Sequence, residues 1–162
     1  MDIVKNFKLI KKTIVDNVQI IAVSKTKSND KILKIYNIGH RNFGENKIQE
    51  LKEKYNELPN DIKWHMIGHL QRNKVKYIAP FIELIHSVDS LKLLLEINKQ
   101  GKKNKRRIKC LLQIKIANEE SKFGILKDEA ENLISLSNNL NYVKIIGLMG
   151  MATFTDNKKI ID

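Results

Sequence analysis

Short apolar runs alternate with amphipathic stretches along the chain, and this alternation constrains the fold more than any other feature. The runs expected to form strands cover residues 20–25, 42–46, 63–68, 81–88, 108–117 and 143–151. Helical spacing of apolar side chains predicts helices over residues 3–15, 29–38, 47–58, 69–78, 90–100 and 127–139, and another beginning near 155. Strands and helices in strict alternation predict an α/β fold built on a parallel sheet.

The first strand ends in a lysine. Ile20 to Val23 is apolar without polar alternation, which predicts a strand buried on both faces. Ser28 begins the next helix, so Lys25 lies where the strand gives way to its loop. Ligands of parallel α/β folds bind at that end of the strands, where a neutral lysine amine is a nucleophile for a carbonyl carbon. The alternative is a solvated surface lysine without a role.

The composition is that of a soluble globular protein with one domain over residues 1–162. Hydrophobic residues make up 42% of the chain and charged residues 30%. No apolar run approaches the roughly 20 residues that a membrane span needs, and the N-terminus lacks the features of a signal peptide. The single cysteine, Cys110, lies in an apolar run and is expected in the core. We therefore expect a cytoplasmic protein without a membrane partner.

The net charge of +12 raises the alternative of a basic nucleic-acid-binding module. Only four of the 30 basic residues are arginine, the better reader of phosphates and base edges. The remaining lysines are spread along the chain, apart from a cluster at 102–107 that we expect to be a solvated loop. Diffuse positive charge supports only weak, salt-sensitive association, so a nucleic-acid partner is the lesser alternative.

Several motifs in order resemble one known family. No Rossmann glycine fingerprint and no Walker loop is found, which favours a barrel over a nucleotide-binding sheet. The motifs are Ala22-Val23-Ser24-Lys25-Thr26-Lys27, Phe43-Gly44-Glu45-Asn46, Trp64-His65-Met66-Ile67-Gly68-His69-Leu70-Gln71-Arg72-Asn73-Lys74, Ser121-Lys122-Phe123-Gly124 and Gly147-Leu148-Met149-Gly150-Met151. Together they are similar, over essentially the whole chain, to the pyridoxal phosphate homeostasis proteins (the YggS/PROSC type), relatives of the alanine racemase N-terminal barrel.

The resemblance implies a (β/α)8 TIM-type barrel that binds pyridoxal 5′-phosphate (PLP). Lys25 matches the lysine that holds PLP as a Schiff base, whereas Lys27 lies past the strand in the turn. Asn46, His65 and Met149 fall on the strands that line the family's pocket. For His65 the alternative is a core histidine, and for Met149 it is plain packing.

Residues near the strand ends are further expected at the rim of the pocket. His69 is expected at a helix start or at the rim, and Ser121 and Lys122 are expected as rim contacts. Members of this family continue through two further strands that hold the cofactor phosphate, so we expect a barrel truncated after about six strands, with two open edges.

The resemblance implies intracellular PLP homeostasis without established catalytic turnover, by a monomer whose partners are PLP and apo forms of PLP-dependent enzymes. The alternative is a PLP-dependent enzyme acting on amino acids, such as a racemase or lyase. Racemases of the related barrel bring a second acid/base group from another domain, and this chain is predicted to have one domain.

Overall fold

The computed structural model describes residues 2–116 and 123–153, and within these ranges six strands form one parallel sheet in chain order. The strands are β1 (Ala22–Val23), β2 (Asn42–Glu45), β3 (Lys63–Met66), β4 (Leu84–Val88), β5 (Ile108–Ile114) and β6 (Val143–Gly150). Every neighbouring pair is parallel. The predicted α/β fold with a parallel sheet is therefore confirmed.

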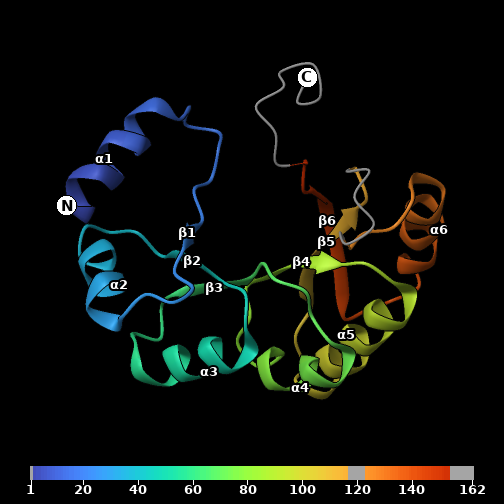
Figure 1. Cartoon of the computed structure of the whole chain (residues 1–162). Coiled ribbons are helices and arrows are strands. Elements are labelled where there is room, and N and C mark those ends of the chain that lie inside the picture. Colours follow the sequence, from blue (N-terminus) through green and yellow to red (C-terminus); the bar gives the residue numbers. More distant parts are fainter. Residues whose placement is uncertain (1, 117–122, 154–162) are drawn as a thin grey trace.

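Helices lie along the outside of the curved sheet, one before the first strand and the others between successive strands (Figure 1). They are α1 (Ile3–Thr13), α2 (Asn29–Tyr36), α3 (Ile48–Glu57), the 3₁₀ turn η1 (Arg72–Lys74) with α4 (Val75–Ile78), α5 (Leu91–Lys103) and α6 (Lys127–Ser137). Because consecutive strands are also neighbours and each crossover carries its helix to the outer face, the sheet curves as an arc of a TIM-type barrel.

The hydrophobic core lies between the sheet and these helices. Trp64 and Met66 of β3 are buried there with Phe43 of β2, and Cys110 is buried as expected. His65 lies between Trp64 and Met66 and therefore points to the opposite face of the sheet, the inside of the arc. Alternate residues of each strand thus supply the core and the barrel interior.

The expectation that the first strand is buried on both faces is wrong. The strand has only two residues, Ala22 and Val23, and the Val23 side chain is 52% exposed. In the described sheet β1 lies at one end of the strand order, so it pairs on one side with β2 alone. The apolar run therefore includes Val23 because this side chain faces the barrel interior, and not because β1 is a central strand.

Several other boundaries differ from the prediction. The fourth strand begins at Leu84 and not at residue 81, and the fifth ends at Ile114 and not at 117. The helix expected over 69–78 is reduced to η1 and α4, because residues 69–71 lie in an irregular segment. The second helix ends at Tyr36, two residues before the predicted end, and Gly39 just beyond it has the expected left-handed conformation, with a φ of 91°.

The basic cluster at 102–107 is more than a solvated loop. Arg106 is half-buried, and its guanidinium donates hydrogen bonds to the carbonyls of Ala79 (2.9 Å) and Ile82 (3.0 Å). This arginine therefore ties the end of α5 to the turn between α4 and β4. The helix expected from about 155 lies outside the described residues. Across the described ranges, the helices are too short or too polar to cross a membrane.

Candidate functional site

A cavity of about 520 Å³ lies at the carboxyl ends of the strands. It is lined by Val23, Lys25, Asn46, Ile67, Gly68, His69, Gln113, Phe123, Met149 and Met151. Its volume falls within the range of roughly 300–1,000 Å³ that small-molecule sites occupy. Three of the four predicted site residues, Lys25, Asn46 and Met149, therefore meet at one cavity although they come from β1, β2 and β6 regions far apart in the sequence.

Lys25 lies in the turn that directly follows β1, and its side chain is exposed on the cavity. The residues on either side of it are fixed. The Ser24 backbone N–H donates to the Gly44 carbonyl at 2.9 Å, which continues the pairing of β1 with β2. Thr26 has a φ of 62°, a left-handed conformation that a β-branched residue adopts only when its surroundings impose it.

Asn46 follows the last residue of β2 and is approached closely by the end of β3. A Cβ atom on Gly68 would collide with the Asn46 carbonyl oxygen and lie 2.7 Å from its Cα. The Ser87 hydroxyl of β4 donates to the Gly68 carbonyl at 2.6 Å and holds this segment from the other side. The glycine therefore allows the cavity wall to close against Asn46.

His65 does not line this cavity. It is buried inside the arc, with its Nδ1 2.9 Å from His86 Nε2 and its Nε2 3.3 Å from Asn42 Oδ1. A neutral His65 that donates from Nε2 to Asn42 and accepts at Nδ1 from His86 satisfies both contacts. Burial, reinforced by the nearby His86, lowers the pKa of His65 to about 4. These contacts are those of an interior histidine, and its predicted role toward the cofactor stays a prediction.

Six further lining residues were not predicted as pocket contacts: Val23, Ile67, Gly68, Gln113, Phe123 and Met151. The Gln113 side chain is buried, and its amide donates to the Phe123 carbonyl at 2.8 Å. Phe123 in turn stacks on His69, with ring centroids 4.0 Å apart. A glutamine in the second half of β5, which is otherwise apolar from Cys110 to Ile114, was a usable signal, because a buried amide needs partners.

His69 lies at the rim of the cavity, where it was expected. Its Nδ1 lies 3.3 Å from an Asp89 carboxylate oxygen. Ser121 and Lys122, also predicted at the rim, lie outside the described residues. In residues 2–116 and 123–153, no cluster of three or more His, Cys, Asp or Glu side chains is arranged to hold a metal ion.

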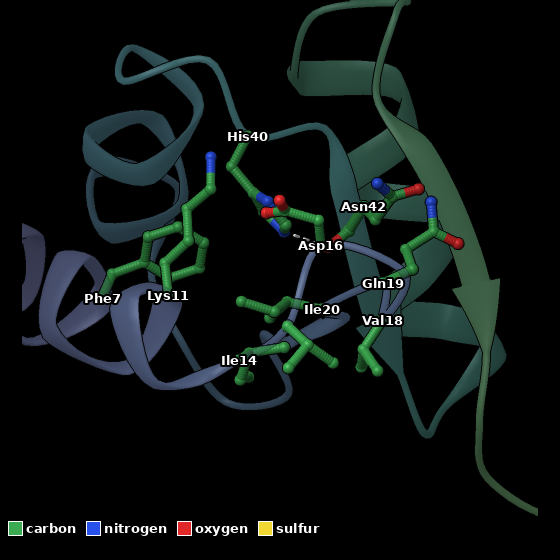
Figure 2. A pocket seen from close by; sticks show the side chains of 10 residues that line it. Phe7, Lys11, Ile14, Asp16, Val18, Gln19, Ile20, His40 and Asn42 are labelled. Carbon is green, nitrogen blue, oxygen red and sulfur yellow. Dashed lines mark hydrogen bonds between the residues drawn. The ribbon is translucent and has the colours of Figure 1, made fainter.

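A second, smaller pocket of about 170 Å³ lies between α1 and the start of β2 (Figure 2). Its wall includes Phe7, Lys11 and His40, and the His40 ring donates to the Asn42 carbonyl at 2.7 Å. Asn42 begins β2 whereas Asn46 follows it, so this pocket lies at the opposite end of the strands from Lys25. It contains none of the predicted cofactor residues.

Comparison with known proteins places the chain in a family. The family model described as "Alanine racemase, N-terminal domain" matches residues 2–161. A pyridoxal phosphate homeostasis protein of Helicobacter pylori is 42% identical over 148 residues, which are 90% of this chain and 67% of that protein. The chain belongs to the pyridoxal phosphate homeostasis protein family. The resemblance noted from the motifs is thereby confirmed.

Solved structures of this family share the fold. PipY of Synechococcus elongatus without PLP superposes with a TM-score of 0.92 at 31% identity, over 98% of this chain and 74% of that one. PipY with PLP bound gives a TM-score of 0.84 at 30% identity, over 95% of this chain and 72% of that one. PipY, described as a member of the COG0325 family, thus shares the fold of this chain both without PLP and with PLP bound.

Proposed function

We propose that this chain binds PLP in the strand-end cavity and takes part in intracellular PLP homeostasis. The observation that carries the proposal is the meeting of Lys25, Asn46 and Met149 at one cavity, in a chain of the pyridoxal phosphate homeostasis family. PipY, whose structure with PLP bound has the same fold, supports the same cofactor.

The lining of the cavity suits the ring and aldehyde of PLP. Val23, Ile67 and Met149 offer apolar walls for an aromatic ring, while Asn46 and Gln113 offer amides for its polar substituents. Lys25 supplies the amine. These residues fit the group, and when bound it supplies an electron sink that the protein's own side chains lack.

We propose that the neutral amine of Lys25 attacks the aldehyde carbon of PLP. A C=N bond forms as the C=O bond breaks, the aldehyde oxygen leaves as water with two protons from the amine, and the product is a Schiff base. The step consumes no oxidant or reductant, and water reverses it. A reversible covalent link would allow the protein both to hold the reactive aldehyde and to release it.

Paired lysine substitutions test the attachment point. Lys25→Ala should abolish the visible absorbance band that PLP forms with the protein, while Lys27→Ala should keep it. The fold should survive both changes, because the two side chains are exposed and bury little area. A band that persists in Lys25→Ala and disappears in Lys27→Ala would contradict the proposal.

Transfer of PLP to an apo-enzyme tests the homeostasis role. The loaded protein, freed of unbound PLP, should restore activity to the apo form of a PLP-dependent enzyme. Specific turnover of an amino acid by the purified, loaded protein would favour the enzyme alternative instead. We further propose that the protein acts as a cytoplasmic monomer, which sedimentation analysis and cell fractionation would check.

A further inference from the structure

A largely buried cluster of one ammonium and two carboxylates lies directly behind the Lys25 turn. Lys54 of α3 is 5% exposed, and its Nζ donates to Glu45 Oε1 (2.8 Å), Glu50 Oε1 (2.7 Å) and the Ser24 carbonyl (2.7 Å). All three ammonium protons therefore have acceptors. Burying a cation in this way carries a desolvation penalty, and removing one of its partners destabilises the folded protein.

The same cluster holds both residues that flank Lys25. The Ser24 hydroxyl donates to Glu45 Oε1 at 2.6 Å, and the Ser24 carbonyl accepts from Lys54. On the other side, the Thr26 backbone N–H donates to Glu50 Oε1 at 2.6 Å. The left-handed Thr26 is therefore tied through its backbone amide to a charged acceptor on α3.

Within the described ranges, the cluster contains a buried carboxylate that is not fully paired, which a purely structural link between α3 and the sheet would not need. Glu45 is fully buried, and its Oε2 has no hydrogen-bond partner among the described residues. Burial raises the pKa of Glu45 despite the opposing bonds from Lys54 and Ser24, whereas the bond from Lys54 lowers the pKa of Glu50. An apolar contact would join α3 to the sheet at smaller expense, so the polar groups point to a requirement for exact backbone direction.

We infer that Glu45, Lys54 and Glu50 form a positioning device that fixes the Ser24–Thr26 backbone and directs Lys25 into the cavity for reaction with PLP. This inference rests on the proposed function. The three residues do not line the cavity, and they act through the turn. A turn held at both flanking residues presents the amine in one direction and spares the entropy of ordering it at the moment of reaction.

Glu50 offers the sharpest test, because it is the partly exposed member of the cluster and Lys54 keeps Glu45 and the Ser24 carbonyl as acceptors when Glu50 is removed. Glu50→Ala removes the acceptor of the Thr26 N–H, and Glu50→Gln keeps an acceptor oxygen at the same position. Glu53→Ala is the matched control, since Glu53 is an exposed glutamate on the same helix. Each variant is studied as the full 162-residue chain.

Two readouts separate positioning from stability. In the cofactor-free protein, hydrogen exchange at the Thr26 amide should accelerate in Glu50→Ala relative to amides in β2, and less in Glu50→Gln. After addition of PLP, borohydride reduction and peptide mapping should show Lys25 adduct forming about tenfold more slowly in Glu50→Ala, with a larger share on Lys27. Glu53→Ala should match the unchanged chain in both.

The outcomes distinguish this inference from the proposed function. If the unchanged chain forms the Lys25 adduct and Glu50→Ala forms it at the same rate, the positioning role alone is overturned, whatever happens to hydrogen exchange at Thr26. Unchanged relative exchange at Thr26 would overturn it too. Absence of any Lys25 adduct in the unchanged, folded chain would contradict the proposed function, and the positioning role would fall with it.

Discussion

His65 illustrates how a single buried side chain can couple stability to pH. Its ring lies inside the arc between Asn42 and His86, and burial lowers its folded-state pKa to about 4. An unfolded chain binds a proton at this ring below about pH 6.5, whereas the folded protein does so only near pH 4. Between these values the unfolded state therefore binds more protons, and the free energy of unfolding falls as the pH falls.

We predict that His65 alone contributes about 3 kcal/mol of stability at pH 7 that is lost on acidification from about pH 6.5 to about pH 4. Urea unfolding at several pH values should show this slope. His65→Gln, which removes the titrating ring, should be less stable at pH 7 but should lose less stability on acidification. Parallel pH profiles for the two proteins would refute the assignment.

Gly68 is the residue that permits close contact between two walls of the cavity. We predict that Gly68→Ala costs about 1–3 kcal/mol, because the new methyl group meets the Asn46 backbone, which cannot yield as a flexible side chain would. It should also weaken PLP binding by displacing Asn46. Gly147→Ala is the control, since its methyl group would only reach Leu111 Cδ2 at an ordinary 3.4 Å. Equal effects of the two changes in urea unfolding would count against this view.

At the scale of elements, the helices differ in how much they bury. Within the described residues, α1 has no buried side chain, whereas α5 buries Leu93, Leu94 and Ile97 against the core. Opening free energy follows burial more than helix length, and these two helices are similar in length. The Asp2 carboxylate accepts N-cap hydrogen bonds from the backbone N–H groups of Val4 and Lys5, and these bonds stabilise α1 only locally.

We therefore predict that amides of α1 exchange with solvent much faster than amides of α5 under native conditions. Hydrogen exchange followed by mass spectrometry resolves the two helices as separate peptides. Comparable protection of the amides in both helices would show that α1 is held by contacts beyond those described, and it would contradict this prediction.

The outer strands of the arc differ from the inner ones. Leu112 of β5 and Leu148 of β6 are partners in the sheet register, yet Leu112 is fully buried and Leu148 is 60% exposed. Leu112→Ala should cost about 2–5 kcal/mol, whereas Leu148→Ala should change stability by about 0.5 kcal/mol or less. Urea denaturation of the two variants checks this matched pair. A large cost at Leu148 would mean that this face of β6 is covered in solution.

At the scale of the whole molecule, the sequence predicted the parallel sheet, the order of its elements and the end of the strands where the site lies. Short apolar runs and the 3.6-residue spacing of apolar side chains are local properties of the sequence, and they carry this information directly. The sequence could not reveal that β1 is a two-residue end strand, because its apolar run is the same whether Val23 faces a packed layer or the cavity.

Part of the candidate site was likewise beyond sequence reasoning. Lys25, Asn46 and Met149 were found from motifs, but the separation of His65 from the cavity depends on how far along β3 the cavity extends. In the sequence, Glu45, Glu50 and Lys54 have the charges of ordinary surface residues. Only the packing of α3 against the Lys25 turn reveals that the three side chains are hydrogen-bonded to one another.

The most direct test is to identify the residue of this chain to which PLP becomes attached. Titration with PLP, borohydride reduction and peptide mapping by mass spectrometry would locate the adduct. We predict a visible absorbance band and a reduced adduct on Lys25, with little on Lys27. A folded protein that forms no band, or one whose adduct lies predominantly on another lysine, would contradict this prediction.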